Sequence, residues 1–249
     1  AYLRAQDAPV TLSECLISNN TSVGEAGGVV YYCPVATYTG VIERCSILRN
    51  YGGQNGGGIY VDARTGLMQD CLVAGNQTGQ KGGGIYNQGG SSGRVFIRNS
   101  TIVNNKAATQ AGGLFCNVIV NLLDVYNTIV YDNTATATNN VAVLNANSIF
   151  RYGCTTDPAV SDEGNITNNP LFAIAGIGSG TNAILSDYRL QANSPCIDTG
   201  TNGVVTSSLD LDDNPRIYPV DGMVDMGAYE AESGRKGTMF LFTILNVRQ

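Results

Sequence analysis

The sequence of 249 residues predicts an all-β fold, namely a right-handed parallel β-helix of five to six coils with a C-terminal capping module. Three observations predict this fold. A motif recurs along most of the chain, its apolar residues come in short β-type runs, and its commonest residues are weak helix formers. Self-similarity at a period of about 20–50 residues is typical of stacked architectures, in which each repeat contacts only its neighbours.

The repeat is centred on one Asn. A small residue lies five positions before this Asn and, in the first four repeats, a Gly lies eight positions after it. A large apolar residue stands three positions before the small one, and a β-branched residue stands two positions after it. The repeated Asn residues are Asn20, Asn50, Asn76, Asn105 and Asn133, and the small residues are Cys15, Cys45, Cys71, Ser100 and Thr128. The small position recurs after 30, 26, 29 and 28 residues, which suits a coil of two or three short strands.

Other repeat architectures fit this period less well. Turn pairs such as Asn19-Asn20 and Gly52-Gly53 interrupt the repeats, which disfavours helical repeats. A β-propeller blade needs about 40 residues or more. The spacing from the small residue to a following Gly-Gly pair is constant, so one loop of each coil absorbs the variation in length. Right-handed winding follows the usual rule for parallel crossovers.

Stacking of successive coils predicts three columns of residues. Corresponding residues of neighbouring coils lie about 4.8 Å apart, so Cys15, Cys45 and Cys71 begin a column of small side chains. The repeated Asn residues are expected to form a ladder at a corner, with each side-chain amide bonding the next. The Gly-Gly pairs lie at 27–28, 57–58, 83–84 and 112–113. We expect these pairs to supply backbone conformations closed to residues with a Cβ.

The chain divides into residues 1–150, which hold the repeats, and residues 151–249, which form a loop-rich capping module and a terminal tail. A sixth coil is expected to begin at 147–150, where the pattern of 127–130 returns. The end of a β-helix exposes strand edges and core, and it needs a cover. The apolar residues expected to cover the last coil are Tyr188, Leu190, Ile197, Val224, Met226 and Tyr229.

The C-terminal part contains four short motifs in a fixed order. They are Asp187–Gln191, Ser194–Gly200, Asp210–Arg216 and Val224–Glu230. Over residues 169–230 this series resembles the C-terminal module of the bacterial extracellular right-handed parallel β-helix proteins called choice-of-anchor Q proteins. The resemblance implies a secreted or cell-surface bacterial protein, in a family most of whose members have no known activity. The chain departs from the family at Asp213, where Gly is usual, and in the apolar tail after Glu230.

Composition excludes several classes of partner. The net charge is −6 and only three residues are Lys, which argues against nucleic acid because its binding depends on Lys and Arg. The chain has no His, so a zinc site is not expected. The apolar run at 239–245 is far too short to span a bilayer, and it is interpreted as a terminal strand or a partner contact. The absence of a signal-peptide pattern fits a mature secreted protein or a piece of a longer one.

Seven cysteines are present, and three of them belong to the column of small residues. We expect those three to be buried and reduced, because a free Cys behaves as a small apolar residue. The other four are Cys33, Cys116, Cys154 and Cys196. A disulfide between Cys154 and Cys196 is one option for clamping the C-terminal part.

Acidic and amide residues alternate in one segment near the C-terminus, with the spacing of ligands in a calcium loop. They are Asp210, Asp212 and Asn214, with Asp221 and Asp225 nearby. The Gly of a tight calcium loop is missing, so we favour turns in which Asp and Asn bond their own backbone. A further option is that Asp225 pairs with Arg216 or Arg189. No cofactor is firmly implied, and calcium stays open as the alternative.

The position just before the small column carries charged residues in the first three repeats. The row consists of Glu14, Arg44, Asp70, Asn99 and Asn127. A polysaccharide lyase would use Arg44 as a base beside acidic metal ligands. A glycoside hydrolase needs two carboxylates about 5–9.5 Å apart, whereas Glu14 and Asp70 are about 9.6 Å apart with Arg44 between them. We therefore favour a row of cross-strand ion pairs.

Aromatic residues recur just after the Gly-Gly pairs. They are Tyr31, Tyr32, Tyr60, Tyr86 and Phe115, with Tyr31 one place out of step. Exposed rings in a column could stack on sugar rings. We favour an aromatic stack that lies inside the coil or seals it, because aromatic side chains dominate core burial.

These observations assign no catalytic, cofactor-binding or metal-binding residue. They predict a non-catalytic extracellular or cell-surface protein with a structural, adhesive or glycan-contacting role. The working surface would be the regular side of the solenoid or the loops at 31–40, 87–93 and 116–121. One alternative is a polysaccharide lyase or glycoside hydrolase. Another is a subunit of an extracellular assembly, in which residues 237–249 add a strand to a neighbouring subunit.

Overall fold

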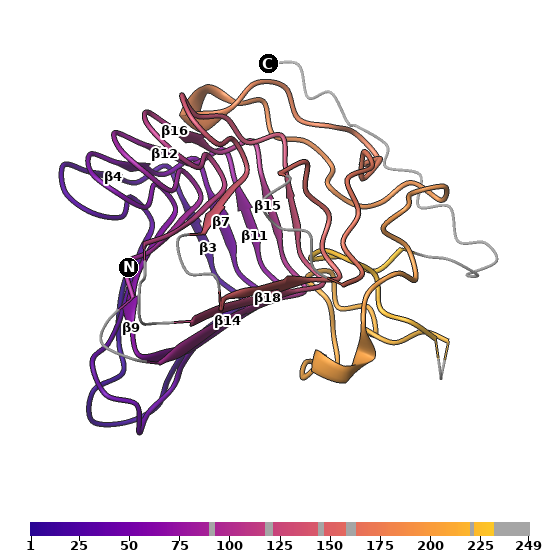
Figure 1. Ribbon diagram of the computed structural model, residues 1–249, viewed down its shortest axis with the longest axis horizontal. Helices are drawn as coiled ribbons and strands as arrows, with labels where there is room; N and C mark the ends of the chain where they lie inside the picture. The colour runs from indigo at the N-terminus through magenta and orange to yellow at the C-terminus, as the bar shows by residue number, and fades with distance from the viewer. Residues whose placement is uncertain (90–92, 118–121, 144–146, 158–162, 220–221, 232–249) are drawn as a thin grey trace, which may run out of the picture.

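The structure is a computed structural model that describes residues 1–89, 93–117, 122–143, 147–157, 163–219 and 222–231. It confirms the predicted fold class, because the chain forms an all-β parallel solenoid of about five turns (Figure 1). Its described residues contain no α-helix and two 3-10 helices, η1 (Gly180–Asn182) and η2 (Asn202–Val204). No helix in this part of the chain is long and apolar enough to cross a membrane. The tail at 237–249, including the apolar run at 239–245, lies outside the described residues.

Four parallel sheets form the sides of the solenoid. Sheet A contains β1 (Tyr2–Arg4), β5 (Val29–Cys33), β9 (Ile59–Ala63), β13 (Ile85–Asn87), β17 (Leu114–Cys116) and β20 (Val141–Val143). Sheet B contains β2 (Val10–Ser13), β6 (Gly40–Glu43), β10 (Thr65–Gln69), β14 (Arg94–Arg98), β18 (Leu122–Tyr126) and β21 (Ile149–Arg151). Sheet C contains β3 (Leu16–Ser18), β7 (Ser46–Leu48), β11 (Leu72–Ala74), β15 (Thr101–Val103) and β19 (Ile129–Tyr131). Sheet D contains β4 (Thr21–Ser22), β8 (Tyr51–Gly52), β12 (Gln77–Thr78) and β16 (Lys106–Ala107).

Each coil passes through sheets A, B, C and D in turn, and equivalent residues of successive coils pair in register. Ile47 of β7, for example, pairs with Ile17 in the coil before it and with Val73 in the coil after it. Ile47 and Val73 are fully buried in the core. A sixth coil is present, but its predicted register is wrong: β21 pairs with β18, so Phe150 stacks on Val125, and it is Cys154 rather than Ile149 that bridges to Ile129. Right-handed winding stays a prediction.

The corners of each coil are made by residues in the left-handed conformation. One such residue precedes the small column, namely Glu14, Arg44, Asp70, Asn99 and Asn127 in successive coils. A second precedes the Asn ladder, namely Asn19, Arg49, Gly75, Asn104 and Asp132. A third directly precedes the Gly-Gly pairs, namely Ala26, Gly56, Gly82 and Ala111. A residue with a Cβ pays about 1–2 kcal/mol for this conformation, and in-register pairing of the coils offsets that cost.

The Gly-Gly pairs have a different role from the predicted one. All four pairs lie in the described coils, and their φ angles stay outside the left-handed region, which the preceding residue adopts instead. The glycines are needed because a Cβ at these positions would clash with the neighbouring coil. A Cβ on Gly28 would lie 2.6 Å from the carbonyl oxygen of Gly58 and 3.0 Å from the side-chain Nδ2 of Asn50. The second glycine of each pair lies against the Asn ladder and the first lies against the backbone just after the ladder Asn of the next coil, so neither position has room for a Cβ.

The C-terminal module, defined here as residues 163–231 without 220–221, packs along the outer face of sheet C (Figure 1, orange to yellow). Phe172, Tyr188, Cys196 and Met226 are buried there. The solenoid residues beneath them are Leu72, Ala74, Val103 and Ile129. Tyr188 and Met226, which were expected to cover the last coil, thus cover a side of the solenoid instead. The reason is that sheet C is apolar on both faces, a feature that the repeat pattern does not show.

Candidate functional site

The predicted Asn ladder is present. The Oδ1 of Asn50 accepts hydrogen bonds from the backbone N–H of Asn20 at 3.0 Å and from its Nδ2 at 2.9 Å. The same pair of bonds joins each later Asn to the next, at 2.9–3.0 Å. The second Nδ2 hydrogen reaches a carbonyl in the coil before, as Asn76 does to Ile47 at 2.8 Å. Every polar atom of these buried amides is therefore used between Asn50 and Asn133.

The ladder has a sixth member that the sequence did not reveal. Asn140 Oδ1 accepts two bonds from Asn133, from the backbone N–H and from Nδ2, both at 3.1 Å. Asp157 then closes the end of the ladder, because its Oδ2 accepts the backbone N–H groups of Asn140 and Val141 at 2.9 and 2.7 Å. Asn140 follows Asn133 by only seven residues, so a search at the repeat period passes over it.

The column of small residues is also present, and a hydroxyl or thiol is required in it. Each side chain donates to the carbonyl oxygen two residues earlier, with distances of 2.7–3.2 Å from the first to the last member. Cys45 and Cys71 are fully buried, whereas Cys15 at the N-terminal end is half-buried. Burial raises the pKa of the Cys71 thiol well above its usual value. These thiols fill the core and hold the corner.

All seven cysteines are free thiols. Cys154 and Cys196, the pair considered for a disulfide, are fully buried in the same apolar cluster. The hydrogen bond of Cys154 with Cys196, together with burial, raises the pKa of the Cys154 thiol. The clamp between solenoid and C-terminal module is therefore apolar packing rather than a covalent bond.

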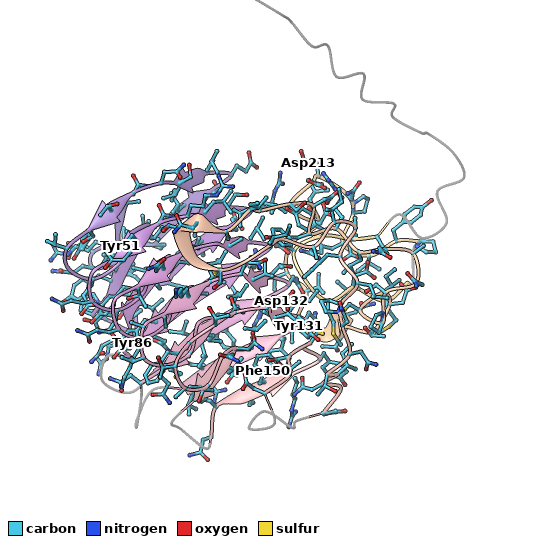
Figure 2. The ribbon with its side chains drawn as sticks, turned by 90° about the horizontal axis from the view of Figure 1, so that it is seen from above. Tyr51, Tyr86, Tyr131, Asp132, Phe150 and Asp213 are labelled. Carbon is cyan, nitrogen blue, oxygen red and sulfur yellow. The ribbon has the colours of Figure 1, made fainter. Side chains whose placement is uncertain are left out.

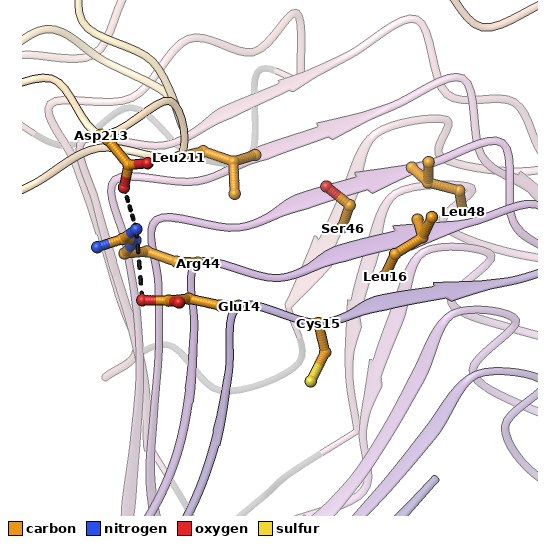
Figure 3. A pocket seen from close by; sticks show the side chains of 8 residues that line it. All are labelled: Glu14, Cys15, Leu16, Arg44, Ser46, Leu48, Leu211 and Asp213. Carbon is orange, nitrogen blue, oxygen red and sulfur yellow. Dashed lines mark hydrogen bonds and ion pairs between the residues drawn. The ribbon is translucent and has the colours of Figure 1, made fainter.

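A surface cleft with a volume of about 380 Å³ lies where Leu211 and Asp213 of the C-terminal module approach the first two coils (Figure 3). Its walls carry Arg44, which is 3.4 Å from Glu14 Oε1 and forms a second ion pair with Asp213. The remaining lining residues are Cys15, Leu16, Ser46, Leu48 and Leu211. The cleft therefore offers two exposed carboxylates on either side of one guanidinium, above a partly apolar floor.

Asp70, the third charged residue of the corner row, does not face Arg44 as a partner. It binds Arg216 of the C-terminal module, with its Oδ1 at 2.7 Å from both Nε and Nη2. Arg216 Nη1 also binds Glu230 Oε1 at 2.9 Å. Asp70 and Arg216 are 0% and 1% exposed. The predicted row of cross-strand ion pairs is therefore correct for Glu14 and Arg44 and wrong for Asp70.

Three backbone carbonyls complete the shell around Arg216. The guanidinium donates to Gly227 at 3.0 Å, Ala228 at 3.0 Å and Asn99 at 3.1 Å. The single positive charge of Arg216 is thus shared between the carboxylates of Asp70 and Glu230. Burial raises the pKa of Asp70 and raises that of Glu230 to about 8, although Arg216 opposes both shifts. No local sequence pattern points to this network, because Asp70 and Arg216 are 146 residues apart.

The acidic segment near the C-terminus forms turns in which Asp accepts backbone N–H groups, which is the interpretation that the sequence favoured. Asp210 is fully buried and accepts the backbone N–H groups of Asp212, Asn214 and Glu230 at 2.7–2.8 Å. Asp225 accepts N–H groups from Asp198 and Ala231 and has no ion pair with Arg189 or Arg216 among the described residues. Asp221 lies outside the described residues, within which no group of three His, Cys, Asp or Glu could hold a metal ion.

The aromatic column seals the outer face of sheet A. Tyr60, Tyr86 and Phe115 are stacked in parallel, with ring centroids 5.5 and 5.4 Å apart. Tyr86 and Phe115 are buried, and Lys81 Nζ lies 4.8 Å from the Phe115 centroid. Tyr31 points inward, where its hydroxyl accepts the N–H of Gly40 at 2.9 Å. The sealing interpretation is therefore confirmed, and Figure 2 shows Tyr86 far from Asp213 of the cleft.

Comparison with known proteins adds no relative. Neither a scan of protein-family models nor searches of curated proteins and solved structures find a match to this chain. The resemblance to choice-of-anchor Q proteins accordingly depends on the sequence motifs alone.

Proposed function

We propose that the chain is a non-catalytic structural protein of the bacterial cell surface or exterior, of the choice-of-anchor Q type. The observation that carries this proposal is the buried Asp70–Arg216–Glu230 network. An enzyme on this scaffold would need its carboxylates and bases open to a polysaccharide. Here Asp70 is closed off from solvent, and Arg44 is neutralised by Glu14 and Asp213.

The C-terminal motifs support the same proposal. The residues that carry the resemblance are those that dock the module: Arg216 and Glu230 in the buried network, Asp210 in the turn below it, and Tyr188 and Met226 in the apolar cluster. Motif residues that make internal contacts of this kind determine the fold. The module then stiffens the solenoid along one side, which suits a spacer or a scaffold that displays loops.

A panel of polysaccharides tests the proposal. The protein is incubated with acidic and neutral polysaccharides, with and without calcium, and unsaturated uronate absorbance and new reducing ends are recorded. We expect no turnover from the natural chain or from Arg44→Gln. Turnover that Arg44→Gln abolishes, and that the surface control Glu163→Gln leaves unchanged, would overturn the proposal in favour of a lyase or hydrolase.

An adhesive role is the second candidate, and the cleft at Glu14, Arg44 and Asp213 favours it. Two carboxylates and a guanidinium can bond pairs of sugar hydroxyls, and Leu16 supplies an exposed apolar floor. Affinity electrophoresis in gels that contain each polysaccharide measures this contact. We expect Asp213→Ala to weaken retardation by a neutral polysaccharide. Equal retardation of the two proteins would exclude the cleft as the contact site.

A further inference from the structure

The outer face of sheet B carries a group of arginines over its last three strands, β14, β18 and β21. Side chains alternate along each strand, and the inward ones lie in the solenoid core. The outward positions include Arg94, Phe96, Arg98, Asp124, Tyr126 and Arg151. Three arginines against one aspartate give these strands an outward charge of +2, in a chain whose net charge is −6. The outward positions of β2, β6 and β10, in the first three coils, hold no basic residue.

Arg98, Tyr126 and Arg151 form one column on this face, because they pair in register on successive strands. Neighbouring strands lie about 4.8 Å apart, so the backbones of the two arginines are about 10 Å apart with Tyr126 between them. Phe96 lies two residues before Arg98 and therefore on the same face. Basic and aromatic side chains thus alternate over three coils.

Arg98 is held in place without being neutralised. Its guanidinium carbon lies 4.7 Å from the centroid of the Phe96 ring, and its Nη1 donates to the carbonyl of Val204 at 3.2 Å. Among the described residues Arg98 has no ion pair, and burial lowers its pKa. A guanidinium that is already ordered and lacks a counter-charge is suited to bind an anionic group from outside the molecule.

Other polar atoms of this face also lack partners. Arg98 Nε, Arg151 Nε and Asp124 Oδ1 are buried and have no hydrogen-bond partner within the described part of the chain. Asp124 is 4% exposed, and only its other oxygen pairs with Arg94. The ion pair of Arg151 with Glu163 is 3.8 Å long and joins side chains that are 41% and 65% exposed, so it opens at little cost. Buried polar atoms without a partner are rare, and three on one face point to a polar ligand.

Phe96, Tyr126 and Ile149 supply apolar surface beside these charges. All three side chains are half-buried, and none of them belongs to the solenoid core or to the apolar cluster under the C-terminal module. A few charged groups set among aromatic and apolar side chains are typical of sites that bind small rings carrying polar groups. Sugar rings with carboxylates have this chemistry.

A carboxylated polysaccharide fits the face better than an acidic peptide does. Its carboxylates match the forked guanidinium groups, and its hydroxyls match the remaining donors and acceptors. A linear polymer that lies along the solenoid axis meets a new strand about every 4.8 Å. A peptide usually binds a sheet by adding a strand to an open edge, whereas β18 is already paired on both sides, with β14 and β21.

We propose that the outer face of β14, β18 and β21 binds a linear polysaccharide that carries carboxylates. Arg98 and Arg151 bind the carboxylates, and Phe96 and Tyr126 lie against the sugar rings. The polymer runs along the solenoid axis, across the fourth, fifth and sixth coils.

This face is separate from the cleft at Glu14, Arg44 and Asp213, which lies over the first two coils. Figure 2 shows Phe150, the inward neighbour of Arg151, far from Asp213 of the cleft. Binding at the face goes beyond the structural role proposed above and depends neither on the cleft nor on turnover.

Affinity electrophoresis in gels that contain alginate tests this binding. Alginate is a linear polymer with a carboxylate on every sugar, and its propylene glycol ester is the uncharged counterpart. The variants are Arg98→Gln and Arg151→Gln, and circular dichroism checks that each is folded. Arg151→Gln keeps the test valid if Arg98→Gln does not fold, because the side chain of Arg151 is 41% exposed. Lys106→Gln is the matched control, since it removes one positive charge from an exposed residue of the fourth coil on sheet D.

We expect alginate to retard the natural chain and its ester to leave the mobility unchanged. Arg98→Gln and Arg151→Gln should each weaken the affinity about tenfold, the effect of one charge-assisted hydrogen bond, and Lys106→Gln less than about twofold. No retardation of the natural chain, or equal losses in all three variants, would overturn the proposal. Polyglutamate that competes as strongly as free alginate would overturn it in favour of an acidic protein partner.

Discussion

At the scale of single residues, the fold depends on polar side chains that are buried and fully bonded. Each internal ladder Asn accepts two hydrogen bonds and donates two. A buried amide of this kind is costly to remove, because each partner left unsatisfied loses about 1–3 kcal/mol. The residues of the ladder differ mainly in how many such partners they have. Position in the stack, rather than residue type, therefore decides the effect of a substitution.

Asn76→Ala tests the ladder. It leaves two N–H donors of Asn50 and the carbonyl of Ile47 without partners in the core. We expect the free energy of unfolding to fall by about 3 kcal/mol or more, measured by urea denaturation followed by circular dichroism. The matched control is Asn20→Ala at the exposed end, which should cost about 1 kcal/mol or less. Equal losses would show that the ladder is not cooperative with the core.

The Arg216 network predicts a dependence of stability on pH. Burial raises the pKa of Glu230 from 4.5 to about 8 and that of Asp225 from 3.8 to about 6. Between pH 4.5 and 8 the folded chain thus holds more protons than the unfolded chain, so the free energy of unfolding falls as pH rises through this range. Urea denaturation at a series of pH values measures it. Glu230→Gln should flatten the slope, and a slope that is unchanged would contradict the assignment.

At the scale of the elements, short strands are held in register by residues that bend the chain at each corner. The left-handed positions hold Glu, Arg, Asp, Asn, Gly and Ala, so the residue type at a position does not predict the left-handed conformation there. Strain at these corners varies with the side chain. A β-branched residue is the least suited to φ above zero, and Thr138, in the loop before β20, has a φ of 55°.

Thr138→Gly should therefore stabilise the protein by about 1 kcal/mol, because Gly adopts the left-handed conformation without strain. Ala137→Gly, one residue earlier and outside the left-handed region, is the control and should destabilise by about 0.5–1 kcal/mol. Thermal unfolding by differential scanning calorimetry reports both changes. Shifts of the same sign in the two variants would contradict the corner argument.

At the scale of the whole molecule, the C-terminal module is joined to the solenoid along the outer face of sheet C, by an apolar cluster separate from the solenoid core. The module contacts the second coil through Asp213, the third through Arg216 and the fifth through Gly227, whose N–H donates to Asn127 at 2.8 Å. Apolar packing on sheet C accompanies these bonds. The chain is therefore expected to unfold as one unit, which is the mechanical property a scaffold or spacer requires.

The sequence sufficed for most of what repeats and for little that does not. The coil period, the Asn ladder and the column that includes Cys45 follow from local spacing, because each coil copies its neighbour. The Arg216–Asp70 ion pair and the apolar outer face of sheet C were not predicted, because each involves a distant segment that is not part of the repeat. The Gly-Gly pairs were located correctly but explained wrongly, since crowding by the ladder appears only in three dimensions.

Hydrogen exchange on the natural chain and on Arg216→Met tests the central claim, that a buried ion network unites the module with the solenoid. Removing Arg216 leaves the buried Asp70 carboxylate without its ion-pair partner and leaves Glu230 with only the N–H of Asp225, and breaking a buried ion pair costs about 3–5 kcal/mol. We expect amides of the module, such as Ala228, and amides of the third and fourth coils, such as Thr101, to lose protection together and to the same extent. Loss of protection in the module alone, with the coils unchanged, would contradict the account and make the module a separate attachment.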